Sequence, residues 1–173
     1  LGQNGYIGAN SYAAGNGGNI DVKADEFNAK GGLIFARTYG SGNAGDINLS
    51  GTNLSFTDGA QVGASAKEGS TGDGGNISVN AAGSVTIAGK ASEGHSSGLF
   101  SDTESTGTGG NITVTAANLA LGEGGTIRAN ALAAGHGGRI NIKANELQAK
   151  GGDIRARTYG SGNAGDIELS GIN

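Results

Sequence analysis

The chain has 173 residues, of which 37 are glycine, and it contains no proline, cysteine, methionine or tryptophan. Glycine is therefore about three times as frequent as in an average protein. Without cysteine there is no disulfide framework, no thiolate metal site and no thiol nucleophile. The formal net charge of -4 and the lack of a basic stretch argue against nucleic-acid binding. No apolar run approaches the roughly 20 residues needed to span a bilayer, so we expect no membrane insertion.

Two internal periods organise the chain. Residues 1–53 and 121–173 align as 53 pairs with 17 differences, hence 36 identities, and define a long period of 120 residues. Within it, a small-residue corner followed by Ile-x-(Val/Leu/Ile) recurs at intervals of 27, 30, 35, 28 and 27 residues. The isoleucines that mark it are Ile20, Ile47, Ile77, Ile112, Ile140 and Ile167. Both ends of the chain fall inside a repeat, so we expect 1–173 to be a single segment of a longer repetitive chain.

Each repeat divides into three short segments with the alternating pattern of strands that have one buried face. One repeat reads Ile47-x-Leu49, then Leu54-x-Phe56, then Val62-x-Ala64, with glycine and polar residues between the segments. Helix-period patterning is absent, and each interior glycine would destabilise a helix by about 1 kcal/mol. The sequence predicts an all-β, right-handed parallel β-helix of about six coils with three strands per coil, whose core is a ladder of the six isoleucines.

The strand register is ambiguous around the longest repeat. Either Leu99 and Ser101 or Phe100 and Asp102 point inward, and an inward Asp102 would need a partner. We prefer an inward Phe100, with a break in the strand before Asp102.

Glycine pairs precede the first strand of most repeats, where we expect a sharp corner with positive φ and no room for a Cβ atom between stacked coils. Asn19, Asn76 and Asn111 recur at one position of this corner and predict a partial hydrogen-bonded ladder, interrupted by Arg139. The predicted corner glycines are Gly17, Gly18, Gly74, Gly75, Gly109, Gly110, Gly137 and Gly138.

Candidate catalytic and metal-binding groups do not form clusters. We interpret His95 and His136 as solvated loop residues, because no further ligands lie at a workable spacing. Asp46 and Asp166 recur at a corner, where acids usually accept hydrogen bonds from backbone N–H groups. The densest acidic group is expected to be a solvated face and comprises Asp21, Asp25 and Glu26. We therefore predict no catalytic residue, cofactor or metal site, and no enzymatic activity.

Two features could contact a partner. The stretch 37–46 recurs unchanged as 157–166, and Arg37, Tyr39, Arg157 and Tyr159 within it are candidates for a lateral or glycan contact. The insertion 89–98, with Lys90, Glu93 and His95, is expected to protrude as a surface loop.

The recurring motif Gly-Gly-Asn-Ile-x-Val stands at residues 74–79 and 109–114. It resembles the repeats of filamentous-haemagglutinin-like exoproteins of the two-partner secretion class, especially the Gly/Asn-rich versions of filamentous cyanobacteria. The resemblance covers essentially the whole chain. It implies export through a partner β-barrel to the extracellular surface of a Gram-negative, here cyanobacterial, cell. The secretion domain of that family, with its Asn-Pro-Asn motifs, is missing from this chain.

These observations lead to a functional hypothesis, a non-enzymatic structural shaft of a secreted cell-surface fibre or adhesin. We expect a homo-oligomer or filament, formed by stacking of coils or by lateral contacts, with a surface glycan as another possible partner and no nucleic acid. The alternative is a polysaccharide-binding or polysaccharide-cleaving β-helix, which a groove lined by Asp and Arg on one face would favour. A disordered matrix segment is a third interpretation of the composition.

Overall fold

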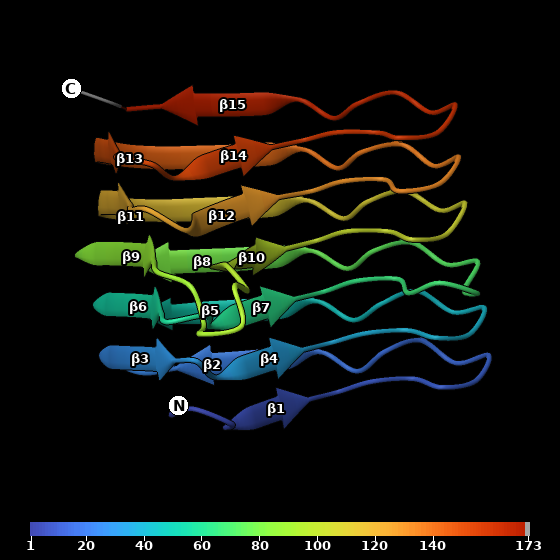
Figure 1. Ribbon diagram of the computed structural model, residues 1–173, viewed down its shortest axis with the longest axis horizontal. Coiled ribbons are helices and arrows are strands. Elements are labelled where there is room, and N and C mark those ends of the chain that lie inside the picture. Colours follow the sequence, from blue (N-terminus) through green and yellow to red (C-terminus); the bar gives the residue numbers. More distant parts are fainter. Residues whose placement is uncertain (172–173) are drawn as a thin grey trace.

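The computed structural model describes residues 1–171 as an all-β parallel β-solenoid of about six turns, without a helix among those residues. The predicted fold class is thus confirmed. Figure 1 shows the coils stacked one above another, with the first strand at one end of the stack and the last strand at the other. Parallel pairing joins equivalent strands of successive coils throughout.

One face of the solenoid is a six-stranded sheet built from the third strand of each coil, which we call the outer sheet. Its strands, in spatial order, are β1 (Tyr6–Gly8), β4 (Leu33–Phe35), β7 (Gln61–Gly63), β10 (Ser97–Phe100), β12 (Gly125–Arg128) and β14 (Asp153–Arg155). The inward column of this sheet is continuous, because Ile34, Val62, Leu99 and Ile127 pair in register and are fully buried.

The other two sides are formed by the first and second strands of each coil. The first strands are β2 (Ile20–Lys23), β5 (Ile47–Gly51), β8 (Ile77–Ala81) and β15 (Ile167–Ser170). The second strands are β3 (Glu26–Lys30), β6 (Asn53–Thr57) and β9 (Ser84–Ala88). Two long strands, β11 (Ile112–Leu121) and β13 (Ile140–Ala149), pass through both positions. The three separate strands predicted for each coil are therefore joined into two in those coils.

The marker isoleucines form one column. Register pairs link Ile20 to Ile47, Ile47 to Ile77, Ile77 to Ile112, Ile112 to Ile140 and Ile140 to Ile167. All are buried except the last, which lies on the end coil and is 44% exposed. Each large side chain thus contacts its equivalent one coil away, at a strand spacing of about 4.8 Å.

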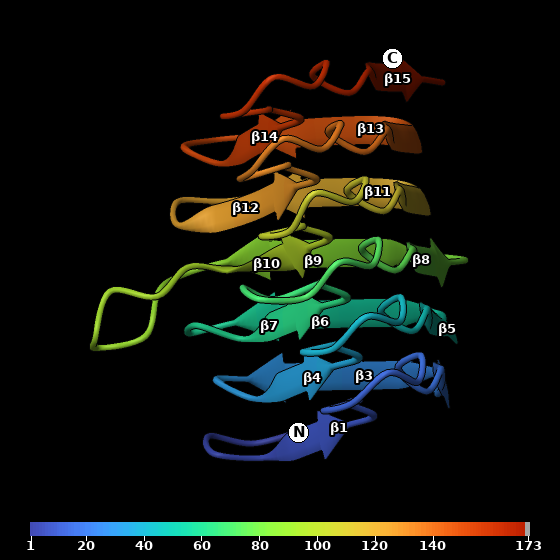
Figure 2. The ribbon, with the colours of Figure 1, turned by 90° about the vertical axis from the view of Figure 1, so that its right-hand side faces the viewer.

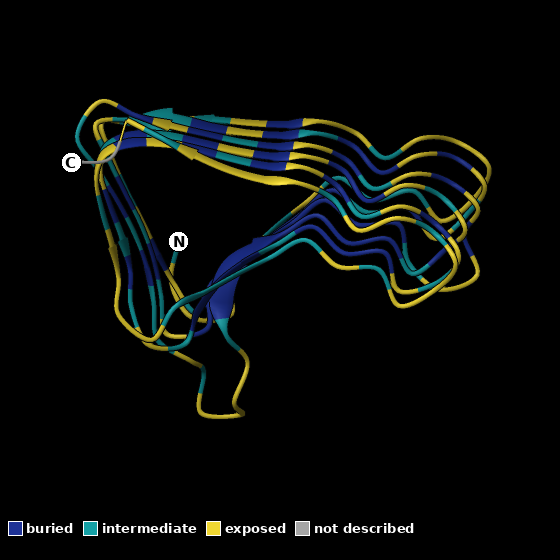
Figure 3. Cartoon of the chain, turned by 90° about the horizontal axis from the view of Figure 1, so that it is seen from above, coloured by how far each residue is buried: buried dark blue, intermediate teal, exposed yellow. Residues whose placement is uncertain are grey.

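Between the outer sheet and the next first strand, every coil leaves the triangular body and doubles back, a feature that sequence analysis did not predict. We call these segments the arm, which comprises residues 9–19, 36–46, 64–76, 101–111, 129–139 and 156–166. Figure 3 shows the arms extending from one corner of the triangle, nearly superimposed. Backbone hydrogen bonds close the two limbs on each other, such as Gly75 N–H to the Ala64 carbonyl at 3.0 Å.

Small side chains fill the space between the limbs. Ala36, Thr38, Ala66 and Thr103 are completely buried there, although none of them contributes a large apolar surface. The arm therefore depends on backbone hydrogen bonds between coils more than on apolar packing, which explains how a chain with so few large side chains folds.

The corner glycines belong to this arm, and the structure corrects one of the two reasons predicted for them. None of the eight has a positive φ. Positive φ occurs instead at glycines such as Gly31, Gly59 and Gly124, near the turns between second and third strands. The second reason accounts for Gly75 and Gly110, because a Cβ atom on either would lie 2.0 to 2.1 Å from a carbonyl oxygen of the preceding coil.

The preferred register at the longest repeat is wrong. Leu99 is fully buried and lies between Val62 and Ile127 in the inward column. Phe100 points to the other side of the sheet, where the Arg128 guanidinium covers its ring with 4.6 Å between the guanidinium carbon and the ring centroid. Phe100 is buried by this cover, so its apolar character did not identify the core face.

Replacing the central isoleucine of the column tests the fold. Ile112→Ala removes a side chain with no exposed surface and should lower the free energy of unfolding by about 2–5 kcal/mol. Denaturant unfolding followed by circular dichroism measures this change. The control Thr113→Ala, at an exposed position of the same strand, should stay within about 0.5 kcal/mol of wild type. Equal effects of the two substitutions would contradict the column.

A glycine pair tests the packing of the arm. Gly110→Ala places a methyl group against the Gly75 carbonyl and should destabilise the protein by about 1–3 kcal/mol. Gly2→Ala is the matched control, because no atom lies within 4 Å of its added Cβ. Thermal unfolding should separate the two variants, and a neutral Gly110→Ala would show that the coils are spaced more widely than described.

Candidate functional site

The four residues predicted to contact a partner lie on one surface, but the structure does not bring them all together. Isolated bridges link the Thr38 position through four coil steps to the Thr158 position, so Tyr39 and Tyr159 are separated by about 19 Å along the axis. Tyr39 stacks instead on Tyr12 of the first coil, with 4.9 Å between ring centroids and 8° between ring planes.

This surface continues onto the outer sheet, where it gathers most of the aromatic and arginine side chains of the chain. Phe35, Phe100, Arg128 and Arg155 pair in one outward column, interrupted by Gly63. Sequence analysis missed all four. Each directly follows an inward aliphatic residue of a third strand, and that position is the signal that could have identified them.

Glycine lets the aromatic rings lie flat on the sheet. A Cβ atom on Gly63 would be 2.9 Å from the Phe35 ring, and one on Gly98 would be 2.8 Å from the Phe100 ring. Guanidinium groups form the next layer, with the Arg37 carbon 3.3 Å from the centroid of Phe35. Sheet, ring and guanidinium thus stack in order, and the cation–π contact fixes the plane of each guanidinium.

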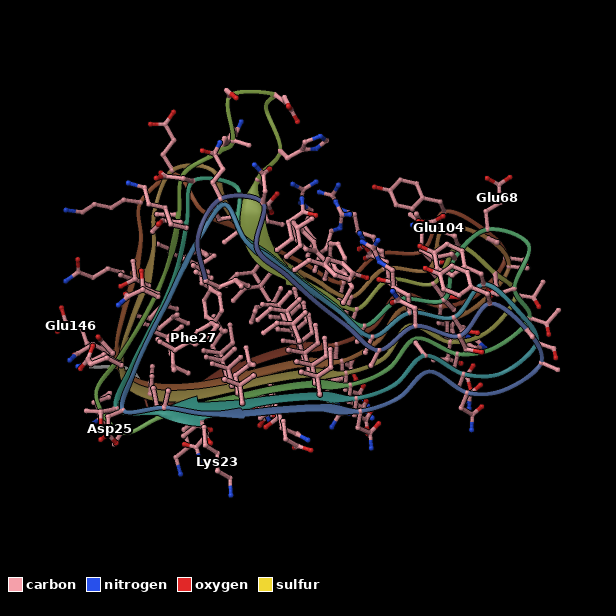
Figure 4. The ribbon with its side chains drawn as sticks, turned by 90° about the horizontal axis from the view of Figure 1, so that it is seen from below. Lys23, Asp25, Phe27, Glu68, Glu104 and Glu146 are labelled. Carbon is pink, nitrogen blue, oxygen red and sulfur yellow. The ribbon has the colours of Figure 1, made fainter. Side chains whose placement is uncertain are left out.

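The stacked layers form the floor of a groove of about 260 Å³. The arm forms one wall, with Ser65, Lys67 and Glu104, and the insertion contributes His95 to the opposite side. An adjoining hollow of about 390 Å³ shares Phe35 and Arg37 with it and extends toward the first coil. Figure 4 shows nitrogen-tipped side chains gathered between the insertion and the arm limb that bears Glu104.

The insertion stands out from the body as expected. An antiparallel bridge between Lys90 and Ser96 closes it into a short hairpin-like loop, and β10 begins at Ser97, within the predicted bounds 89–98. Figure 2 shows the loop projecting sideways from the stack. His95 lines both the groove and the adjoining hollow, whereas Glu93 lines the hollow alone.

The groove is cationic within an acidic chain. Its four basic groups are Arg37, Lys67, Arg128 and Arg155, and its two acids are Asp102 and Glu104. Counting His95 as neutral, four positive and two negative charges leave +2, against -4 for the whole chain. Lys67 forms an ion pair with Glu104 inside the groove.

Asp102 is the most deeply buried acid of the groove. Its Oδ2 accepts a hydrogen bond from Arg128 Nε at 2.7 Å, and its Oδ1 accepts one from the Asn130 backbone N–H at 3.1 Å. Burial nevertheless raises the pKa of this carboxyl above its ordinary value of 3.8, because lost hydration outweighs the opposing attraction of Arg128. Asp102 lies on the arm rather than in the core, and Arg128 of β12 is the partner that a buried acid needs.

Polar side chains on the opposite limb of the arm connect successive coils. The side-chain oxygen of Asn19 accepts from Asp46 N–H at 2.9 Å, Asp46 from Asn76 N–H at 2.7 Å, and Asn76 from Asn111 N–H at 3.0 Å. The predicted ladder and the capping role of Asp46 are confirmed. Arg139 N–H still donates to the side-chain oxygen of Asn111 at 2.9 Å, but the Arg139 side chain has no acceptor and its guanidinium donates to Asp166 Oδ2 at 3.1 Å, so the ladder ends there.

Among the remaining candidates, His136 makes a contact between coils and the acidic group does not form a site. His136 Nδ1 accepts a hydrogen bond from Asn163 N–H at 2.9 Å, in place of an asparagine oxygen. The acidic group Asp21, Asp25 and Glu26 is exposed, as predicted for a solvated face. Among residues 1–171 no group of three or more His, Cys, Asp or Glu side chains is placed to hold a metal ion.

Comparison with protein-family models, curated proteins and solved structures finds no match for this chain. Within the described part of the chain no helix is both long and apolar enough to cross a membrane. Function must therefore be inferred from the geometry of the solenoid and its groove.

The buried acid makes a pH-dependent prediction. Because the pKa of Asp102 is raised on folding, the folded state binds its proton more tightly than the unfolded state. The free energy of unfolding should therefore decrease as pH rises from 3.8 through the raised pKa, and this contribution should be absent in Asp102→Asn. Denaturant midpoints measured across that range give the slope. The exposed control Asp25→Asn should keep the wild-type dependence, and an unchanged slope in Asp102→Asn would refute the assignment.

Proposed function

We propose that the chain is a non-enzymatic structural shaft segment of a secreted fibre or adhesin at a bacterial cell surface, of the filamentous-haemagglutinin-like type. The observation that carries this proposal is the unbroken register of the isoleucine column over all coils. Each coil adds about 4.8 Å along the axis, so the length of the shaft is proportional to its number of coils. The resemblance of the repeats supports the extracellular location and export by two-partner secretion.

A shaft of this kind can associate with copies of itself. The strands at the two ends of each sheet pair on one side only, which leaves a row of N–H and C=O groups able to accept a further coil. Apolar side chains are exposed on the last coil, where Ile167 and Leu169 have 44% and 45% of their surfaces accessible. In the 173-residue chain by itself, end-to-end stacking would bury both side chains and extend the column, as a following coil of a longer chain would do.

A second candidate function is polysaccharide binding, which the groove favours because it combines arginines with two carboxylates on one face. The carboxylates support binding rather than cleavage. Asp102 is held by Arg128 and a backbone N–H, and Glu104 is held by Lys67, so both act as partners of cations.

Sedimentation velocity over a range of concentrations tests the shaft. We expect species heavier than the 16.7 kDa monomer to increase with concentration. Leu169→Lys, on the exposed last coil two residues after the end of the isoleucine column, should reduce this association. Leu132→Lys is the matched control, because that leucine is 44% exposed on the side of the arm. A monomer at every concentration would contradict self-association, and an effect of Leu132→Lys alone would indicate lateral contacts in place of end stacking.

A further inference from the structure

We propose that the groove on the outer sheet binds a linear anionic polysaccharide, carrying carboxylate or sulfate groups, that lies parallel to the solenoid axis. This inference deepens the second candidate function, on which it rests, by naming the ligand class, its orientation and its contacts. The charge distribution is the first argument. Three of the five arginines of the chain line this groove, and the groove has net positive charge although the chain as a whole is acidic.

The arginines are presented in the form that oxyanions require. A guanidinium that lies flat on an aromatic ring keeps the N–H groups at its edge free for two parallel hydrogen bonds to a carboxylate or sulfate. Arg37 over Phe35 has this arrangement, whereas Arg128 over Phe100 already donates its Nε–H to Asp102 and keeps only its terminal N–H groups for a ligand. Arg37 and Arg155 also have buried Nε atoms without a hydrogen-bond partner among the described residues. Because those Nε atoms are buried, a ligand in the groove would have to bind the terminal guanidinium nitrogens.

The orientation follows from the topology. Arg37 belongs to the second coil, Lys67 to the third, Arg128 to the fifth and Arg155 to the sixth, so the cations succeed one another along the axis. Four coil steps correspond to about 19 Å. A linear polymer that lies along the axis can meet all of them, whereas a polymer that crosses the axis meets at most those of one or two coils.

The other groups of the groove suit a sugar. Gln61 and Thr126 offer neutral hydrogen-bond partners, and Glu104 adds an acceptor for hydroxyl groups between the cations. The exposed Tyr12 and Tyr39 pair beside the groove provides a flat face for a sugar ring.

Binding of defined polymers to the full chain tests the proposal. The probes are polygalacturonate and chondroitin sulfate, with dextran as the neutral polymer and single-stranded poly(dT) as the nucleic acid, each measured by calorimetry at low and high salt. We expect both anionic glycans to bind, with affinity that falls as salt rises, and dextran to bind far more weakly. Equal affinity for dextran, or tighter binding of poly(dT) than of either glycan, would overturn the proposal.

Two double variants locate the site. Arg37→Gln with Arg155→Gln removes two groove cations and should weaken glycan binding by about tenfold or more. The matched control, Arg139→Gln with Lys143→Gln, makes the same charge change at exposed positions outside the groove. Circular dichroism and thermal unfolding verify that both variants fold. Equal losses in the two variants would show non-specific charge attraction and would refute the site.

A charge-preserving variant covers the case in which the groove variant does not fold. Arg37→Lys with Arg155→Lys keeps both positive charges but removes the planar guanidinium, and it should bind several-fold more weakly than wild type if the paired hydrogen bonds matter. Full affinity in this variant would contradict the proposed contacts.

The size of the recovered polysaccharide separates this proposal from the proposed shaft. Polymer of unchanged length agrees with both. Shortened polymer would contradict the non-enzymatic shaft and leave the binding site standing, whereas loss of self-association without loss of glycan binding would count against the filament alone.

Discussion

Backbone hydrogen bonds between successive coils are the interaction on which the packing of both the body and the arm depends. They hold equivalent residues one strand spacing apart, so whatever lies between two coils must fit within about 4.8 Å. In the body, this spacing stacks isoleucine on isoleucine. In the arm, it leaves no space for a Cβ atom between Gly110 and the Gly75 carbonyl. High glycine content and a scarcity of large side chains are therefore results of one constraint, and they do not indicate disorder.

Periodic apolar residues made the body of the solenoid predictable. The six isoleucines and the alternating segments after them indicate strands, and their regular spacing indicates stacked coils. The arm escaped prediction because its interior is Ala, Ser, Thr and Gly, which carry no apolar period. Leu99 and Phe100 show a second limit. Phe100 is the larger apolar residue, yet Gly98 and Arg128 cover it outside the core, so only its alignment with Val62 and Ile127 identifies Leu99 as inward.

The groove shows how average composition can conceal a local site. A net charge of -4 describes the whole chain, whereas the cations of the outer sheet come from separate repeats and meet only after the coils stack. No continuous stretch of sequence contains them. Arg37 and Tyr39 were identifiable because they lie in the duplicated stretch. Arg128 and Arg155 occupy strand positions where the first copy of the repeat has Gly8 and Phe35. The two copies therefore share the same strands but differ in the outward side chains of the outer sheet.

The arm also gives the rod an unequal cross-section. A thin double layer projects from one corner of the triangular body in every coil, and hydrogen bonds join it to the layers above and below. A rod with such a projection resists bending in the plane that contains the arm and the solenoid axis far more than bending perpendicular to that plane. A fibre of these coils would therefore flex in a preferred direction, and the side toward which it curves would be set by glycine-rich segments that contribute almost no apolar core.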